Sequence, residues 1–296
     1  MDELRRKYGL EHLLRAAGLP RSTFYYQLKA RALPDSDADL KSRIHQVFGE
    51  HRGRYGYRRV ALQLRQEGTL INHKAVQRLM QVLGLKSLVR PKKYRSYRGA
   101  GHVAIANILD RQFGAEGPNL AWVTDVTEFN VRGEKLYLSP VMDLYNGEIV
   151  TYKTSRRPTF DLVGGMLRSA IAKLREGEGP LIHSDQGWQY QQLGYRRLLE
   201  EKGLTQSMSR KGNCLDNAAM ESFFGTLKSE FFYVDQIDTI EQLGDGIRQY
   251  IHYYNHDRIK LKLKGLSPVQ YRTQAFGAKL KLSNIWGSVQ LSGRFC

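Results

Sequence analysis

The chain has 296 residues, of which 41% are hydrophobic and 10% aromatic, enough for at least one substantial core. At roughly 150 residues per domain, this length predicts two or three folded units. No apolar run approaches the ~18 residues of a membrane span, and the N-terminus has no apolar signal-peptide stretch. Two cysteines, Cys214 and Cys296, are too few for a disulfide framework or a Cys-rich zinc site. Secreted scaffolds, membrane proteins and zinc-finger modules are therefore excluded, and we expect a cytoplasmic protein.

The charge of the chain is unevenly distributed. There are 46 Lys and Arg against 29 Asp and Glu, a net charge of +17. Residues 41–118 hold 16 basic and 4 acidic side chains, whereas residues 119–233 hold 14 of each. A strongly basic region gains affinity for a polyanion such as DNA by counterion release, and a basic surface kept for solubility is the alternative. The neutral block beside it predicts a separate core with a different task.

The first ninety residues have helical patterns. Residues 1–39 are predicted to form a helical pair, either a hairpin or a small helix-turn-helix. Within residues 40–89, apolar residues recur at i, i+3, i+4 and i+7 from Tyr57 and again from Val76, the spacing of one helix face. Gly68 is expected to end the first helix, Asn72 to be the N-cap of the second, and Gly84 to end the second. This pattern predicts a helix-turn-helix DNA-binding domain over residues 40–89.

Basic and polar side chains lie outside the apolar stripes of these helices. We expect DNA contacts from Lys74, Gln77 and Arg78 on the second helix and from Arg58 and Arg59 on the first. An ordinary helical pair with a hydrated outer face is the alternative.

A basic linker over residues 90–118 is predicted to follow. It begins with Lys92, Lys93, Arg95 and Arg98 interleaved with tyrosines, and Pro91 disfavours helix there. An extended segment of this composition lies along a phosphate backbone, unless it is only a solvated connector.

After about residue 119 the apolar period changes from helical to two. A strand through Asp125 is followed by strands at about 135–144 and 148–155, joined at the hairpin signal Asn146-Gly147. Helices and strands then alternate, over about 161–174, 180–185, 190–202, 204–209 and 216–231. This order predicts a mixed five-stranded sheet with flanking helices, a catalytic core over residues 119–233. Residues 234–275 are predicted to extend the core with a helix and a basic stretch, and the tail 276–296 has no interpretation.

Three acidic residues stand out in this pattern. Asp125 shares the inward face of its predicted strand with Val123, and a buried carboxylate needs a cation as its partner. Asp185 ends a predicted strand, and Glu221 lies one turn into the last helix of the core. Hard divalent cations prefer carboxylate oxygens, and two-metal centres cleave phosphodiesters. The alternative is that the three are ordinary surface acids, since Asp at strand ends and Glu on helices are common there.

The spacing of these acids is informative. Asp125 and Asp185 are separated by 59 residues, Asp185 and Glu221 by 35, and Lys228 lies seven beyond Glu221. The second spacing resembles the D,D-35-E pattern of retroviral-integrase-like transposases. The local sequence is similar to a large family of bacterial insertion-sequence transposases made from two overlapping reading frames, and the chain resembles the second-frame (OrfB-type) product. The matching stretches are Gly53–Val60, Trp122–Phe129, His183–Gly187, Ser209–Phe224 and Tyr254–Tyr271.

This resemblance implies a ribonuclease-H-like integrase core preceded by the all-α DNA-binding region. Asp125, Asp185 and Glu221 would be the catalytic acids that bind two Mg²⁺ ions, with Mn²⁺ as a substitute. Lys228 matches the lysine that contacts transposon-end DNA near the scissile phosphate. Arg210 and Lys211 either contact DNA there or are simply solvated.

Three functions follow from the resemblance. The first is a transposase that cuts insertion-sequence ends with water and joins them with the freed 3′-hydroxyl, acting on the bacterial nucleoid. It would bind terminal inverted repeats and target DNA as at least a dimer. The second is a non-catalytic DNA-end-binding accessory or inhibitor that works only with the first-frame product, because the chain begins at Met1 without a heptad run. The third is a structure-directed nuclease of the same fold. The helix-turn-helix and basic linker argue against it, because a nuclease that recognises DNA shape does not need a domain that reads sequence.

Overall fold

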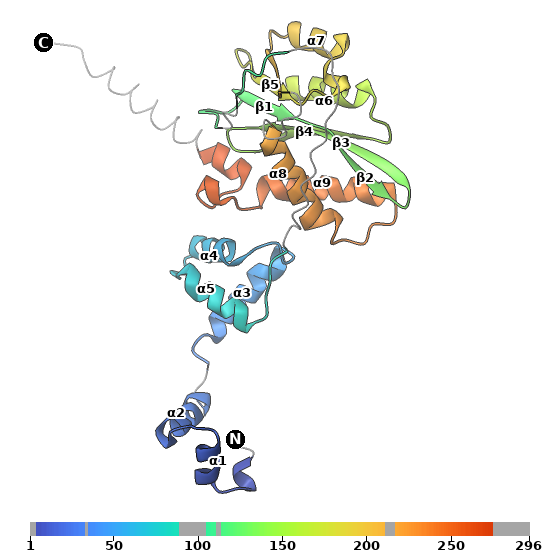
Figure 1. Ribbon diagram of the computed structural model, residues 1–296. Helices are drawn as coiled ribbons and strands as arrows, with labels where there is room; N and C mark the ends of the chain where they lie inside the picture. Colours follow the sequence, from blue (N-terminus) through green and yellow to red (C-terminus); the bar gives the residue numbers. More distant parts are fainter. Residues whose placement is uncertain (1–3, 33–34, 89–104, 111–113, 211–216, 275–296) are drawn as a thin grey trace, which may run out of the picture.

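The computed structural model of the protein describes residues 4–32, 35–88, 105–110, 114–210 and 217–274. The chain forms an N-terminal helical pair, a three-helix domain and an α/β core (Figure 1). The predicted linker residues Lys92, Lys93, Arg95 and Arg98 lie outside the described residues, as do Lys211 and the tail. Within the described ranges, no helix has the length and apolar character required to cross a membrane.

The N-terminal pair consists of α1 (Leu10–Ala16) and α2 (Arg21–Ala32), after a single 3₁₀ turn, η1 (Leu4–Arg6). Gly18, at φ +63°, allows the chain to reverse between them. Leu14 and Phe24 are buried, so the pair has a small apolar contact of its own.

The three-helix domain comprises α3 (Ala38–Glu50), α4 (Tyr57–Gln66) and α5 (His73–Val82). The two predicted apolar stripes pack against each other and against α3, and Val60, Leu64, Val76 and Leu79 are all 0% exposed. The side chain of Asn72 accepts the backbone N–H of Lys74 at 2.9 Å, which confirms the predicted N-cap.

One mixed sheet forms the centre of the core. Its strands are β1 (Ala121–Thr124), β2 (Thr127–Val131), β3 (Glu134–Asp143), β4 (Ile149–Ser155), β5 (Leu181–Ser184) and β6 (Gln206–Met208). The long strand β3 pairs antiparallel with β4 along one edge and with β1 and β2 along the other. Beyond β1, the strands β5 and β6 add in parallel.

The sheet has six strands where five were predicted, because the first predicted strand is interrupted. Thr124 pairs with Val141 and Thr127 with Leu138, so β1 and β2 follow one another along β3 in continuous register. Between them, the backbone N–H of Val126 donates to the carboxylate of Asp125 at 2.7 Å, a local bond that competes with the sheet ladder. Asp125 therefore lies at a break in the strand, and the expectation that it lies mid-strand is wrong.

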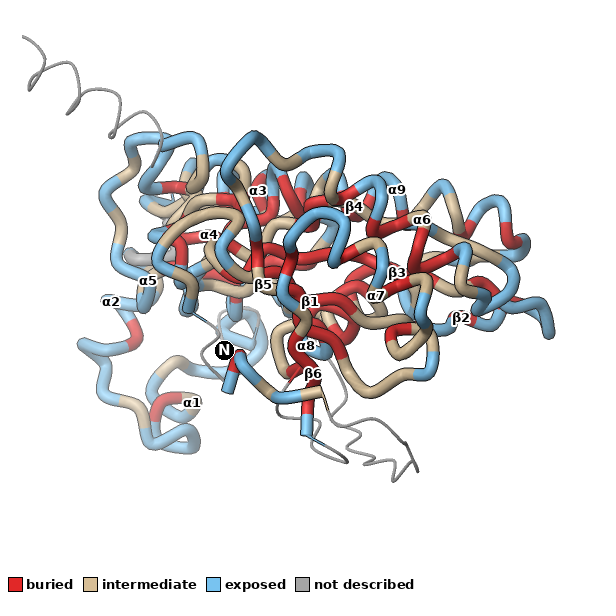
Figure 2. The backbone as a smooth tube through the Cα atoms, turned by 90° about the horizontal axis from the view of Figure 1, so that it is seen from above, coloured by how far each residue is buried: buried red, intermediate tan, exposed pale blue. Residues whose placement is uncertain are grey.

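Helices cover both faces of the sheet (Figure 1). On one face lie α6 (Phe160–Ile171) and α7 (Leu193–Glu200), preceded by the short 3₁₀ helix η2 (Trp188–Tyr190). On the other lie α8 (Ala218–Leu227), which continues as the π-helix η4 (Lys228–Phe232), and α9 (Ile240–His256). Figure 2 shows the buried residues concentrated along the central strands and the inner sides of these helices.

The three-helix domain is fastened to the C-terminal part of the core. The hydroxyl of Tyr55 donates to the carbonyl of Asp257 at 3.1 Å and accepts the backbone N–H of Ile259 at 2.8 Å. Ile259 packs into the apolar core of the three-helix domain, and Arg54 donates to the carbonyl of Glu230 at 3.0 Å. The three-helix domain and the helix that continues from α8 are thus in direct contact.

Candidate active site

Asp125 and Asp185 come together because their strands are parallel neighbours. The register pairs Val123 of β1 with His183 of β5, and each aspartate follows two residues later, directly after its strand ends. The carboxyl ends of adjacent parallel strands lie at the same sheet edge. Both side chains are partly exposed there, so the edge is open to a ligand.

The helix that carries Glu221 is tied to the same sheet edge. Asn217, directly before α8, donates its side-chain amide to the carbonyl of Thr124 at 3.2 Å. Because Thr124 precedes Asp125, this bond brings the first turn of α8, and Glu221 with it, toward the aspartates. The sequence predicted only that a helix begins near residue 216. The bond from Asn217 joins residues 93 positions apart, so local sequence does not reveal it.

Electrostatics at this edge disfavour the charge of Asp125. Burial raises the pKa of Asp125 well above its ordinary range, and the charges of Asp185 and Glu221 raise it further. Burial also raises the pKa of Asp185, although the backbone N–H of Gly187 donates to its carboxylate at 2.9 Å. The three predicted acids therefore act on one another, with Asp125 at the centre.

The three acids are close, but they are not assembled as a complete ligand set. Among the described residues, no three His, Cys, Asp or Glu side chains are arranged to hold a metal ion. Glu221 is exposed on α8, whereas Asp125 and Asp185 are partly buried. The structure thus brings the two aspartates together and leaves Glu221 at the rim.

Oxygen atoms suited to a hard cation are available at this edge. Within the described ranges, hydrogen bonds reach only one carboxylate oxygen of Asp125 and one of Asp185. The side-chain oxygen of Asn217 is buried there and has no hydrogen-bond partner among the described residues. Carboxylate and amide oxygens are the ligands of Mg²⁺ and Ca²⁺, so these residues fit a divalent cation.

Lys228 lies at the start of η4, two turns beyond Glu221. Its ammonium donates to the carbonyl of Glu128 at 3.2 Å and lies 5.1 Å from the centre of the Phe129 ring. Its positive charge lowers the pKa of Asp125, opposing the effect of burial. Lys228 is therefore within electrostatic range of the acids.

His183, which precedes Asp185 by two residues, has a structural role. Its ring is 0% exposed, and its two nitrogens lie 2.9 Å from the hydroxyl of Ser207 and 3.1 Å from that of Ser209. These bonds fix the end of β5 against β6 and so support the loop that carries Asp185.

The predicted DNA contacts fall into separate groups. Lys74, Gln77 and Arg78 are exposed on α5, where Arg78 also pairs with Asp37 at 2.8 Å. Arg58 is likewise exposed on α4.

Two other residues that were predicted to contact DNA lie close to acidic side chains of the protein. Arg59 turns toward the core, with its guanidinium 3.8 Å from the carboxylate of Glu230. Arg210 pairs with Asp110 in the strand-connecting region next to β6. Sequence reasoning placed Arg59 with Arg58 and did not find its partner, because the two belong to different domains.

Comparisons with known proteins agree with this architecture. Family models described as "Integrase core domain" match residues 115–214 and 221–276, and one described as "HTH-like domain" matches residues 34–93. The putative transposase InsK for insertion sequence element IS150, from Escherichia coli K12, is 57% identical over 276 residues, which cover 93% of this chain and 98% of that protein. The chain belongs to the insertion-sequence transposases with an integrase core.

Two more distant matches are a transposase and a solved structure. The probable transposase for insertion sequence element IS1353 from Shigella flexneri is 40% identical over 92% of this chain and 54% of that protein. The catalytic core domain of HTLV-2 integrase, solved in complex with magnesium, is 17% identical, covering 53% of this chain and 98% of that one with a TM-score of 0.43. The integrase-core and HTH-like models, together with the transposase relatives, make this chain a DDE-type polynucleotidyl transferase with a helix-turn-helix-like DNA-binding region.

Proposed function

We propose that this transposase cuts the ends of an insertion sequence and joins them to target DNA, with Asp125, Asp185 and Glu221 as its catalytic acids. The observation that carries the proposal is the parallel register of β1 and β5, which brings two carboxylates to one open sheet edge. The bond from Asn217 to Thr124 supports the assignment of Glu221 as the third acid. The spacing of the three in the sequence agrees with it.

Asp125, Asp185 and Glu221 would hold two Mg²⁺ ions, with Mn²⁺ as a substitute, and the orphaned oxygen of Asn217 supports a cation there. When bound, the ions supply an activated water for cutting and stabilise the charge that develops on the attacking and leaving oxygens. Two backbone N–H groups orient the aspartates: Val126 and Gly187 each donate to one carboxylate oxygen, which also opposes the rise in pKa caused by burial. Lys228 adds a positive charge beside the acids for a DNA phosphate.

The exposed face of α5 would read the terminal inverted repeats, with Lys74, Gln77 and Arg78 at the DNA and Arg58 beside them. Joining two ends to a target requires at least two copies of the chain on DNA. The first-frame product is a further partner, and the cytoplasmic nucleoid is the site of action. Arg59 is the exception in this group, because its contact with Glu230 favours a role between domains.

One observation favours a second candidate function. Glu221 is exposed and the three acids do not form an assembled metal set among the described residues. An accessory subunit that binds element ends and is completed only by the first-frame product would have this property. DNA binding is common to both candidates, whereas cleavage by the isolated chain belongs to the first.

Single-turnover cleavage of a labelled duplex that carries the element end tests the proposal, in Mg²⁺, in Mn²⁺ and in EDTA. Asp125→Asn is expected to slow metal-dependent cleavage by about a thousandfold, ~4 kcal/mol of transition-state stabilisation, and to leave DNA affinity within about twofold. Glu200→Gln, an exposed change on α7, is the matched control and is expected to cleave normally. Tight binding by the wild-type chain with no metal-dependent cleavage would favour the accessory function.

A further inference from the structure

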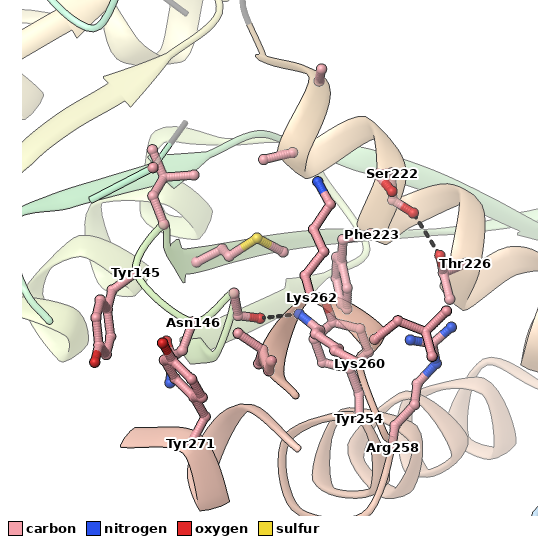
Figure 3. Close-up of a pocket in the computed structure, with 18 of the residues that line it drawn as sticks. Tyr145, Asn146, Ser222, Phe223, Thr226, Tyr254, Arg258, Lys260, Lys262 and Tyr271 are labelled. Atoms are coloured by element: carbon pink, nitrogen blue, oxygen red, sulfur yellow. Dashed lines mark hydrogen bonds between the residues drawn. The ribbon is translucent and has the colours of Figure 1, made fainter. Parts of the chain in front are cut away.

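A cavity of about 870 Å³ lies beside α8 (Figure 3). Ala218 and Ser222, which flank Glu221 on the helix surface, belong to its lining. Its walls come mainly from the end of β3 and the β3–β4 turn, from α8, and from the end of α9 with the segment that follows it. Arg59 of α4 also lines the cavity, so the three-helix domain, the sheet and the C-terminal segment all contribute to it.

The lining of the cavity is cationic and aromatic. Four lining residues are Arg or Lys and none is Asp or Glu, as far as the described residues go. Three tyrosines complete the walls. In Figure 3, Lys262 extends toward the helix that carries Ser222. Besides the two arginines, the cationic and aromatic side chains of the lining are Lys260, Lys262, Tyr145, Tyr254 and Tyr271.

Two of the four cations are already compensated. Arg258 makes a bidentate pair with the carboxylate of Glu230 at 2.7 and 2.8 Å, and Arg59 lies 3.8 Å from the same carboxylate. Lys260 differs from both, since its ammonium donates to the carbonyl of Gly147 at 3.0 Å and lies 4.4 Å from the centre of the Tyr254 ring. No carboxylate in the described part of the chain forms an ion pair with Lys260.

Because the ammonium of Lys260 is partly buried and has no carboxylate partner among the described residues, an anion would stabilise its charge. Burial lowers the pKa of Lys260 to about 7, and the neighbouring charges of Arg258 and Arg59 act in the same direction. An anion in the cavity would restore the charge of the ammonium. The cavity thus complements the acidic edge of the sheet: one site has excess negative charge and the other has excess positive charge, and both adjoin α8.

The wall that α8 contributes includes three small side chains besides Phe223 and Thr226. Ala218, Ala219 and Ser222 line the cavity, so a ligand can approach the helix backbone closely. The volume is larger than a phosphate alone needs, and the aromatic walls suit a sugar or a base. Tyrosine rings stack on bases irrespective of sequence, while lysines bind phosphates.

We propose that this cavity binds one nucleotide unit of the DNA strand that passes α8, with Lys260 and Lys262 at its phosphate and the tyrosines at its sugar or base. The inference rests on the proposed function, because it needs DNA at α8. It adds a second anchor for the strand beyond Lys228 and the three acids. The bound strand would then be held on two adjacent faces of one helix.

The salt dependence of DNA binding tests this inference, with the full chain in EDTA so that cleavage does not interfere. Lys260→Met and Lys262→Gln are each expected to weaken binding about tenfold and to reduce the slope of log K against log salt by about 0.9, the value for one lost phosphate contact. Lys202→Gln, at an exposed lysine next to α7 on the other face of the sheet, is the matched control and is expected to change neither.

A scan of the duplex with single neutral methylphosphonates then identifies the phosphate. At one position the modification is expected to weaken binding by the wild-type chain about tenfold and to have no further effect on Lys260→Met. An unchanged salt slope in both lysine variants, or an additive effect at every position, would overturn the inference.

Stability and cleavage measurements separate the remaining explanations. Lys260→Met is expected to melt no lower than the wild type, because it removes a desolvated ammonium; a large fall in Tm together with an unchanged slope would mean that Lys260 is only structural. If the wild-type chain and both lysine variants bind and cleave DNA alike, with the same salt slope, the proposed function stands and the nucleotide site in the cavity is rejected. A wild-type chain that does not bind DNA would reject the proposed function itself.

Discussion

The pair between Glu230 and Arg258 is the strongest test of how the segment after α9 is held against η4 within the core. The carboxylate of Glu230 accepts two bonds from Arg258, at 2.7 and 2.8 Å, and one from the hydroxyl of Tyr250 at 2.9 Å. Both charged side chains are 7% exposed. Glu230→Gln would retain the size of the side chain while removing its charge, which leaves the guanidinium of Arg258 buried without its counter-ion.

Breaking a buried ion pair by removing one partner costs about 3–5 kcal/mol. A change of that size lowers the Tm of a unit of 150–250 residues by roughly 6–20 °C, at about 2–4 °C per kcal/mol. Thermal and urea unfolding of the full chain measure it. Glu241→Gln is the matched control, because Glu241 also pairs with an arginine, at 2.8 Å, but is 72% exposed; we expect no measurable loss.

The double variant Glu230→Met, Arg258→Met completes the cycle. Replacing a buried ion pair by apolar side chains of similar volume is often neutral or stabilising, so the double variant is expected to recover most of the loss. If Glu230→Gln melts like the wild type, or if the double variant melts lower than the single one, the pair does not have the burial and geometry described here.

The pH dependence of unfolding provides a second readout of Glu230. Burial alone would raise its pKa, but the hydrogen bonds and charge of Arg258 outweigh burial and the pKa lies below its ordinary value of 4.5. Because the folded-state pKa is lowered, the stabilisation is complete above pH 4.5 and is lost as pH falls through the lowered pKa. Glu230→Gln is expected to reduce this acid-side loss.

Three further changes test other elements. Asn72→Ala removes the bond to the backbone N–H of Lys74 and is expected to cost about 1 kcal/mol, read as a shift in the urea midpoint. Gly246→Ala normally favours a helix, but here the added Cβ would clash with the ring of Phe231; we expect a net loss of about 1–3 kcal/mol in unfolding free energy, and a gain would contradict the packing. Arg78→Ala is expected to weaken binding to the element end in a gel-shift titration with little change in Tm, since its ion pair is exposed.

Much of the three-helix domain and of the core's element order could be predicted because the signals are local. Helix periodicity, the cap at Asn72 and the hairpin at Asn146-Gly147 depend on residues within a few positions of one another. The same holds for the interval between Asp185 and Glu221, which is a property of the sequence itself. These features suffice to predict a mixed sheet with flanking helices and to nominate the three acids, whereas the ribonuclease-H-like fold and the catalytic role of the acids were implied by the resemblance to a known family.

The break at Asp125 shows the limit of such signals. Alternation of side chains predicts one strand through this position, and the continuous pairing along β3 agrees with it. The ladder is nevertheless interrupted there, where Val126 donates its backbone N–H to the carboxylate of Asp125. Whether a carboxylate competes successfully with the sheet depends on its surroundings, which alternation does not describe.

Long-range partners were decided by the tertiary structure alone. The sequence determined by itself which residues could be helix faces, strand ends and acids, because each of these properties depends on near neighbours. Only the folded chain decided that Asp125 and Asp185 end adjacent parallel strands, that Asn217 reaches Thr124, that Arg59 turns to Glu230, and that Lys260 donates to the carbonyl of Gly147. Contacts between residues 60 or more positions apart depend on how the helices and strands pack. That packing is determined by many residues along the chain, so neither partner's local sequence predicts the contact.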